Sequence, residues 1–307
     1  MISLLRTAGL ALLSGLLFFG TAWDASAQRL NQDPTMESRV APTDAAARRA
    51  AFADRQSLFQ RSLVAEVGAK NIGPSIMSGR VVDIDAHETD PSHFIVAYAS
   101  GGLWITWNNG QSFEPLFDHE GVMTIGDIAV DWDSGTIWVG TGENNSSRSS
   151  YSGDGVYKST DWGKTWSHVG LAGSHRTGRI IIQPKDANTV WVASLGALYS
   201  ANPDRGVFKT TDGGASWSQT LSINDRTGAV DLVADPSNPD VLYAAMWERD
   251  RRAWNFVESG VGSGIHKSTD GGETWTKISG GDSGFPDGSG VGRIGLTVFP
   301  GDSNVLY

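Results

Sequence analysis

The sequence contains no cysteine, and this absence excludes disulfides and thiolate zinc sites. Its six histidines stand singly, without the paired spacing of metal ligands, so we expect neither a metal nor a cofactor. Basic residues are outnumbered, 24 against 34 acidic ones, which gives a net charge of −10. Because phosphate binding needs a basic surface, this charge argues against a nucleic-acid partner.

A long apolar run is found only near the start of the chain. Arg6, the apolar stretch 10–19 and the small-residue site Ala25-Ser26-Ala27 form the pattern of a secretory signal over residues 1–27. We therefore expect a secreted or periplasmic bacterial protein, cleaved near Ala27, with no membrane span afterwards. An uncleaved anchor is the alternative, although the apolar core is short for a span.

Glycine and tryptophan are abundant, at 38 and 12 residues, and they recur together in one repeated stretch. GIHKSTDGGETW (264–275) returns as GVYKSTDWGKTW (155–166), as GVFKTTDGGASW (206–217) and, more weakly, as GLWITWNNGQSF (102–113). The shared acid or amide falls at Asn108, Asp161, Asp212 and Asp270, with separations of 53, 51 and 58 residues. A period of this size predicts one supersecondary unit per repeat, stacked into an array or propeller.

The residues of the unit predict a β-hairpin with a carboxylate at its turn. A short carboxylate can accept hydrogen bonds from backbone N–H groups two or three residues on, and glycine tolerates a positive φ. The aromatic residue that follows, Trp166, Trp217 or Trp275, opens the returning strand. Burying each of these tryptophans contributes about 2–3 kcal/mol.

STDGGETW (268–275), STDWGKTW (159–166) and TTDGGASW (210–217) resemble the Asp-box, or BNR repeat. That box marks propeller blades in sialidases, in xyloglucan-type glycoside hydrolases and in the sortilin/Vps10 N-terminal domain. The chain is most similar to bacterial proteins with a sortilin/Vps10-like N-terminal propeller, and more distantly to xyloglucanases. The resemblance covers about residues 65–307 and implies an all-β propeller, but no single chemistry, because the box is a structural turn in all these families.

The expected organisation is a signal peptide (1–27), a linker with a short helix (28–64) and a propeller (65–307) with four complete blades and part of a fifth. The helix is expected over 44–61 with Thr43 as N-cap, a disordered tail being the alternative. Because an unclosed propeller leaves an unpaired edge, we expect the chain to continue beyond Tyr307. The blades are expected at residues 78–121, 122–174, 175–225, 226–281 and 282–307, the last one incomplete.

Charged residues follow a glycine at the start of most expected inner strands, namely Arg80, Asp127, Arg179 and Arg293, with Ala229 at this position in the fourth blade. Inner strands line the central channel of a propeller, so these side chains would form a mostly cationic ring at its mouth. Such a ring would suit an anionic group such as a carboxylate. The alternative is a set of solvated or mutually paired charges.

Two loops between second and third strands are enlarged, at 143–154 and 247–263. Binding residues concentrate on long loops of rigid scaffolds, and mixtures of aromatic residues and arginine suit sugars, peptides or carboxylates. The alternative is a packed cap over the channel. The candidate ligand-binding residues on these loops are Arg148, Trp247, Arg249 and Trp254.

Glycoside hydrolysis needs two carboxylates flanking a cleft. Xyloglucan-type hydrolases carry a catalytic Asp before the Gly-Gly that ends the second strand of blade one, but AYASGG (97–102) has no acid here. We therefore predict a scaffold that binds a peptide, protein or glycan ligand through its channel-mouth loops, with a glycoside hydrolase as the alternative. The catalytic candidates under that alternative are Asp127, Glu143, Asp154, Glu248 and Asp250.

Overall fold

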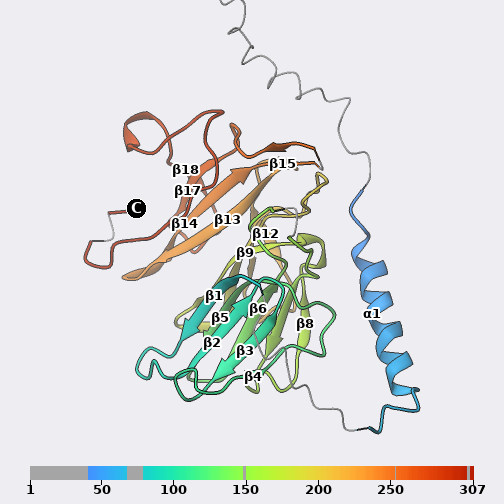
Figure 1. Cartoon of the computed structure of the whole chain (residues 1–307). Helices are drawn as coiled ribbons and strands as arrows, with labels where there is room; N and C mark the ends of the chain where they lie inside the picture. Colours follow the sequence, from blue (N-terminus) through green and yellow to red (C-terminus); the bar gives the residue numbers. More distant parts are fainter. Residues whose placement is uncertain (1–40, 68–78, 148–149, 253, 303–304) are drawn as a thin grey trace, which may run out of the picture. The chain divides into compact units, whose positions relative to one another are not determined.

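The computed structural model describes residues 41–67, 79–147, 150–252, 254–302 and 305–307. Apart from one α-helix and short 3-10 turns, the regular secondary structure of these residues consists of β-strands (Figure 1). The signal segment and most of the linker lie outside the described residues. The described strands form four antiparallel four-stranded sheets and one two-stranded ribbon. This arrangement agrees with the all-β repeat architecture that the sequence predicts.

The first two sheets contain their strands in chain order. The first sheet consists of β1 (Val81–Ala86), β2 (Phe94–Tyr98), β3 (Gly102–Thr106) and β4 (Glu114–Pro115). The second consists of β5 (Ile125–Asp131), β6 (Thr136–Thr141), β7 (Val156–Ser159) and β8 (Ser167–Gly170). Each sheet contains one copy of the repeat, with the box at the turn between its third and fourth strands.

The third and fourth sheets repeat this order. The third consists of β9 (Thr177–Gln183), β10 (Asp186–Ser194), β11 (Gly206–Thr210) and β12 (Ser218–Leu221). The fourth consists of β13 (Thr227–Asp235), β14 (Asn238–Glu248), β17 (Gly264–Ser268) and β18 (Thr276–Lys277). Between β14 and β17 the enlarged loop forms its own ribbon, β15 (Asp250–Arg251) with β16 (Phe256–Val257).

The side chain of the box residue holds each turn, as the sequence predicts, but the backbone N–H that it accepts in every copy lies four residues on and not two or three. Asp212 accepts bonds from the Thr210 hydroxyl at 2.8 Å and from the Ser216 backbone N–H and hydroxyl at 2.9 and 2.6 Å. Hydrogen bonds from the hydroxyl and backbone N–H of Thr165 or Ser216 lower the pKa of Asp161 and of Asp212 to about 2, and the pKa of Asp270 is lowered in the same way. The first copy uses Asn108, whose side-chain oxygen accepts the Ser112 N–H at 2.9 Å.

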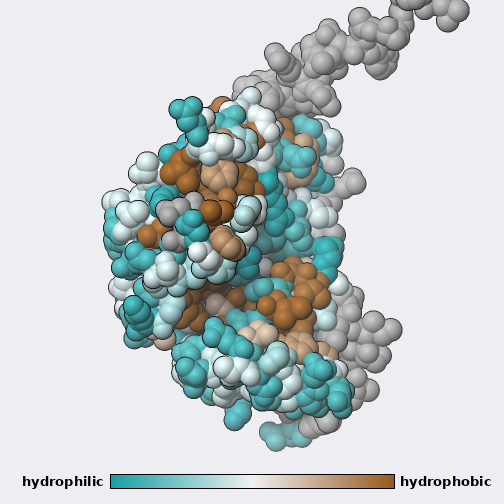
Figure 2. Space-filling view, turned by 90° about the vertical axis from the view of Figure 1, so that its left-hand side faces the viewer, coloured by the Kyte–Doolittle hydropathy of each residue, from teal (hydrophilic) through white to brown (hydrophobic). Residues whose placement is uncertain are grey.

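The box tryptophans connect neighbouring sheets. Each indole N–H donates to a residue in or just after the last strand of the preceding sheet, and each ring covers that junction. Apolar clusters are shared between successive sheets, and Trp138 and Trp191 are fully buried in them. Other apolar side chains gather in patches at the surface, as one face shows in Figure 2. The indole bonds are Trp166 to Leu116 O at 2.7 Å, Trp217 to Val169 O at 2.7 Å and Trp275 to Thr220 Oγ1 at 3.2 Å.

The first strands of the sheets contact one another in succession, β1 with β5, β5 with β9 and β9 with β13. An aspartate on one first strand accepts a backbone N–H from the segment that follows it around the array. This contact occurs three times. The first strands therefore correspond to the inner strands of a propeller. The bonds run from Ile128 to Asp83 at 3.2 Å, from Ile180 to Asp127 at 2.7 Å and from Leu296 to Asp231 at 2.9 Å.

Helix α1 (Ala45–Gln60) precedes the sheets. Its N-cap is Asp44 and not the predicted Thr43, because the Asp44 carboxylate accepts the Ala47 N–H at 2.9 Å. None of its residues is buried. Among the described residues, no helix is long and apolar enough to cross a membrane.

The expected fifth inner strand, 292–298, is not a regular strand. Val298 forms an isolated bridge with Leu306, and Thr297 and Tyr307 exchange two backbone bonds of 2.9 Å. Leu296 still bonds to Asp231 as its counterparts in the other repeats do. The segment therefore docks beside β13 without a sheet of its own among the described residues.

Candidate functional site

The register of the sheets defines which residues share one level of the inner strands. At this level each first strand faces a small residue of the second strand. The pairs are Asp83 with Ala97, Asp127 with Gly140, Arg179 with Ala193 and Asp231 with Ala245. The level therefore holds three carboxylates and one guanidinium.

This composition corrects the mostly cationic ring expected from the glycine alignment. In the second and third sheets the residue after the glycine, Asp127 or Arg179, does lie at the ring level. In the first sheet the residue at this level is Asp83, three positions after Arg80, and in the fourth sheet it is Asp231, two positions after Ala229. Sequence reasoning missed both aspartates because it aligned glycines and not strand register.

Arg179 joins the three carboxylates. Its Nη1 lies 3.2 Å from Asp127 and 3.9 Å from Asp83, and its Nε lies 3.1 Å from Asp231. The neighbouring Asp127 raises the pKa of Arg179 and keeps it cationic. Burial raises the pKa of Asp127 well above its usual range despite the arginine, because desolvation of the carboxylate outweighs the pairing.

A polar cavity of about 170 Å³ opens beside this ring. Arg293 donates to the side-chain oxygen of Asn145 at 2.9 Å across its wall. Hydrogen-bond donors and acceptors are therefore interspersed around the cavity. The charged and amide side chains that line it are Asp127, Arg179, Asp231, Arg293, Asn144 and Asn145.

The first enlarged loop is packed through arginines. Arg80 holds the fully buried Glu143 with two bonds, of 2.7 and 2.6 Å. Arg249 donates to the Ser146 hydroxyl, and Arg176 donates to the Ser150 carbonyl at 2.9 Å. In its described part the loop thus has the contacts of the packed cap, the alternative to a free binding loop. Arg148 lies outside the described residues.

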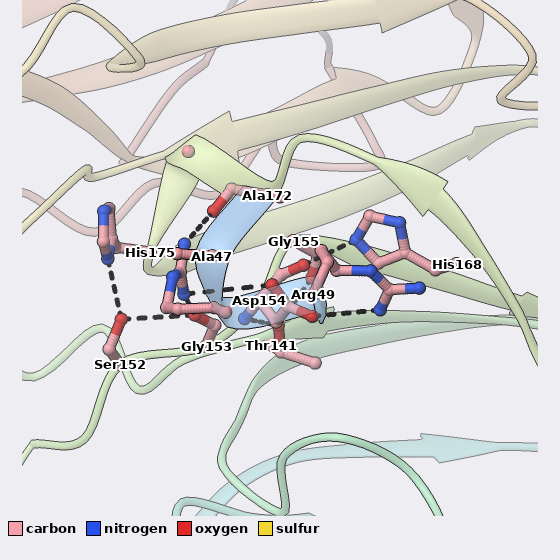
Figure 3. A network of polar contacts seen from close by, with 12 residues as sticks. Ala47, Arg49, Thr141, Ser152, Gly153, Asp154, Gly155, His168, Ala172 and His175 are labelled. Atoms are coloured by element: carbon pink, nitrogen blue, oxygen red, sulfur yellow. Dashed lines mark hydrogen bonds and ion pairs between the residues drawn. The ribbon is translucent and has the colours of Figure 1, made fainter. Parts of the chain in front are cut away.

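The end of the same loop anchors helix α1 (Figure 3). Arg49 bonds to the buried Asp154 at 3.0 Å and to the Tyr157 hydroxyl at 3.0 Å. Arg48 donates to the backbone carbonyls of Gly153 and Ala172. Asp154 therefore serves here as an ion-pair partner of the helix.

The second enlarged loop divides into buried and exposed parts. Trp247 is buried and donates to the Glu258 carbonyl at 2.7 Å, whereas Trp254 is 65% exposed. Arg249 is buried, and burial lowers its pKa well below the usual value. Of these three ligand-binding candidates, only Trp254 is open to a ligand.

The remaining acid candidates also have partners. Glu248 accepts the Gly262 N–H at 2.7 Å, and Asp250 pairs with Arg252 at 2.8 Å. Among the five acid candidates only Asp127 lines the cavity. Asp231, which the sequence did not indicate, lines it as well. Within the described ranges, no group of three or more His, Cys, Asp or Glu side chains is placed to hold a metal ion.

The sequence of this chain is similar to parts of known proteins. Residues 154–285 match the Sortilin-Vps10 family model, described as sortilin, neurotensin receptor 3. A xyloglucanase of a Paenibacillus species is 26% identical over 72% of this chain and 23% of its own length. A Hypocrea jecorina xyloglucanase is 27% identical over 77% and 25%. The chain thus spans about a quarter of the length of these relatives.

Solved structures give the same fold. An ancestral GH74 enzyme superposes with a TM-score of 0.54 and 18% identity, over 75% of this chain and 28% of the enzyme. The GH74 xyloglucanase from Xanthomonas campestris superposes with a TM-score of 0.51 and 18% identity, over 73% and 34%. Together with the box turns and the four repeated sheets, these matches show that the chain has the fold of an Asp-box β-propeller.

Proposed function

We propose that this protein is an exported, non-hydrolytic propeller that binds a glycan at its channel-mouth cavity. The observation that carries the proposal is Arg179 fixed between Asp127 and Asp231 at the cavity wall. Sugar hydroxyls donate and accept hydrogen bonds, so they suit a wall on which carboxylates alternate with guanidinium and amide groups. The xyloglucanase relatives support the same class of ligand.

The partners of the carboxylates support binding without hydrolysis. Both oxygens of Asp127 are engaged, one by Arg179 and one by the Ile180 N–H. Glu143 is held on both oxygens by Arg80. A glycosidase needs one carboxyl that gives up a proton and a second that acts as base or nucleophile, and carboxyl groups whose oxygens are already bonded to protein partners suit neither role.

Hydrolysis is the second candidate, and one specific observation favours it. The raised pKa of Asp127 is what a general acid needs, and Asp231 lies on the other side of Arg179. In that mechanism Asp127 would protonate the leaving oxygen, and Asp231 would act as base or nucleophile.

One pair of assays separates the two functions. Calorimetry with xyloglucan oligosaccharides should show binding by the wild type, and Asp231→Asn should weaken it at least tenfold. The exposed Glu273→Gln is the matched control, with unchanged affinity expected. Reducing-end release should stay at background for both proteins.

Three results would overturn the proposal. Release of reducing ends by the wild type, lost in Asp127→Asn, would establish the hydrolase. Binding of unstructured peptides but of no glycan would show that the ligand is a peptide and not a glycan. Equal glycan affinity in the wild type and Asp231→Asn would show that the glycan does not bind at the cavity.

A further inference from the structure

Three tryptophans from three different turns meet between the first and second sheets. The ring centroids of Trp107 and Trp162 are 5.2 Å apart, those of Trp132 and Trp162 are 5.5 Å apart, and those of Trp107 and Trp132 are 6.3 Å apart. Trp107 is 40% exposed and the other two are partly buried. The cluster therefore reaches the surface through Trp107, while Trp132 and Trp162 pack against the core of the first two sheets.

The turns that carry these tryptophans lie at one end of their sheets. Trp107 and Trp162 belong to the box turns after β3 and β7, and Trp132 belongs to the turn between β5 and β6. In an antiparallel meander these turns share one end, whereas the connection from β6 to β7, with the 143–154 loop, is at the other. The cluster and the channel-mouth cavity are thus at opposite ends of the sheets.

The box turn does not require these indoles. The third and fourth copies have threonine where Trp107 stands, and glycine, Gly213 or Gly271, where Trp162 stands. Trp162 adopts φ = 62°, a conformation that costs a bulky residue about 1–3 kcal/mol and suits glycine. Gly135 leaves room for this ring, because a Cβ there would approach the Trp162 indole nitrogen to 2.4 Å.

Two surface grooves border the cluster. One, of about 510 Å³, is lined by Trp107 and Trp162, and the other, of about 800 Å³, is lined by Trp132. Each groove contains several carboxylates and one lysine, Lys164 in the first and Lys185 in the second. Indole surfaces therefore lie beside both hydrogen-bond acceptors and donors.

This combination selects a class of ligand. The C–H face of a pyranose ring packs on an indole, while its hydroxyls bond to carboxylates and ammonium groups. The excess of carboxylates, such as Glu114 and Asp118 in the first groove and Asp133 in the second, opposes an anionic ligand. The lysine in each groove supplies the hydrogen-bond donor that a polyhydroxylated chain can use, whereas the indole faces offer it the apolar contact.

We propose that Trp107, Trp132 and Trp162 form a second glycan-binding surface, remote from the channel mouth, for a neutral polysaccharide. The ligand class rests on the proposed function, but the position of the surface does not. A polymer long enough to reach both ends of the sheets would contact both sites, whereas a short oligosaccharide in the cavity would not need the tryptophans.

The repeat itself supplies the variants for a test. Trp162→Gly and Trp107→Thr each install the residue of the third and fourth boxes, so the turns should fold as well as before. In affinity electrophoresis through soluble xyloglucan, the double variant should bind the polymer at least tenfold more weakly. Its melting temperature should stay within a few degrees of the wild type, because relief of the positive φ at Trp162 offsets part of the lost packing against the core. Its affinity for short oligosaccharides in the cavity should be unchanged.

The controls separate failure of this proposal from failure of the proposed function. Phe59→Ala removes an aromatic ring of helix α1 that is 63% exposed, and it should leave polymer binding intact. Full polymer binding by the tryptophan double variant, with loss in Asp231→Asn, would overturn the second surface alone. No glycan binding by the wild type would overturn both sites. If the wild type bound oligolysine but not xyloglucan, and the tryptophan double variant lost that binding, the proposed ligand class would be wrong.

Discussion

At the scale of single residues, Arg179 joins the carboxylates of the channel mouth. In the four described sheets it is the one cation at a level shared with Asp83, Asp127 and Asp231. The sequence predicted Asp127 and Arg179 at the ring because both directly follow a glycine. It could not predict Asp83 or Asp231, because strand register depends on bulges that the pattern does not reveal.

The Arg80–Glu143 pair is a residue-scale test of the packed loop. Arg80→Ala should destabilise the protein by about 2–4 kcal/mol, because it leaves the fully buried Glu143 carboxylate without its ion-pair partner. Urea unfolding measures this loss. The double variant Arg80→Met with Glu143→Gln should recover much of it, and a single-variant loss below about 0.5 kcal/mol would contradict the role of the pair.

His266 should make the fourth sheet sensitive to acid. Burial lowers its pKa to about 4, so between pH 6.5 and 4 the unfolded chain binds the proton that the folded chain does not. Stability is complete above about pH 6.5 and falls towards pH 4, by at most about 3 kcal/mol. His266→Phe, which copies Phe208 of the third sheet, should make thermal unfolding less dependent on pH between these limits, while His175, whose pKa burial also lowers to about 4, keeps its share. An unchanged profile would exclude His266 as a cause.

At the scale of elements, the repeat predicted the box hairpins well because their information is local. A carboxylate, two hydroxyls and a glycine within seven residues suffice to specify the turn, and Asp212 accepts from both hydroxyls and from the Ser216 N–H, one residue further on than expected. The sequence could not decide between a free and a packed 143–154 loop, because the partners Arg80, Arg176 and Arg249 come from three different sheets or their connections.

The box turns should contribute stability that depends on an ionised carboxylate. Asp212→Asn should lower the melting temperature at pH 7 by several degrees, since the hydroxyl and N–H of Ser216 then lose their charged acceptor. The difference should shrink as the pH falls from about 4 to about 2, where the native carboxyl takes up its proton. Asn108→Asp, the reverse change in the first box, should raise the melting temperature at pH 7. A pH-independent effect of Asp212→Asn would argue against the charge as its source.

At the scale of the whole molecule, a period of 51–58 residues predicted sheets in series, and the four boxes lie in four separate sheets. The prediction of a regular fifth inner strand was wrong. Its sequence, 292–298, has the alternation of its counterparts, but among the described residues only the short pairing of Val298 with Leu306 accompanies it. Strand formation there depends on pairing partners, which the local pattern does not supply.

The signal over residues 1–27 gives a prediction at this scale. Expressed with its own leader in a Gram-negative host, the protein should reach the periplasm with Gln28 as its first residue, as N-terminal mass spectrometry would show. Replacement of Ala25 and Ala27 by leucine should block this cleavage. A mature chain that begins with Met1 would support the uncleaved anchor.

The central claim is that the channel mouth holds an intact glycan, and a crystal structure of the protein with a xyloglucan oligosaccharide tests it most directly. We expect an uncleaved oligosaccharide in the cavity, with hydroxyls bonded to Asp231, Arg293 and Asn145. A cleaved product beside Asp127, or an empty cavity in a protein that binds the sugar elsewhere, would contradict it.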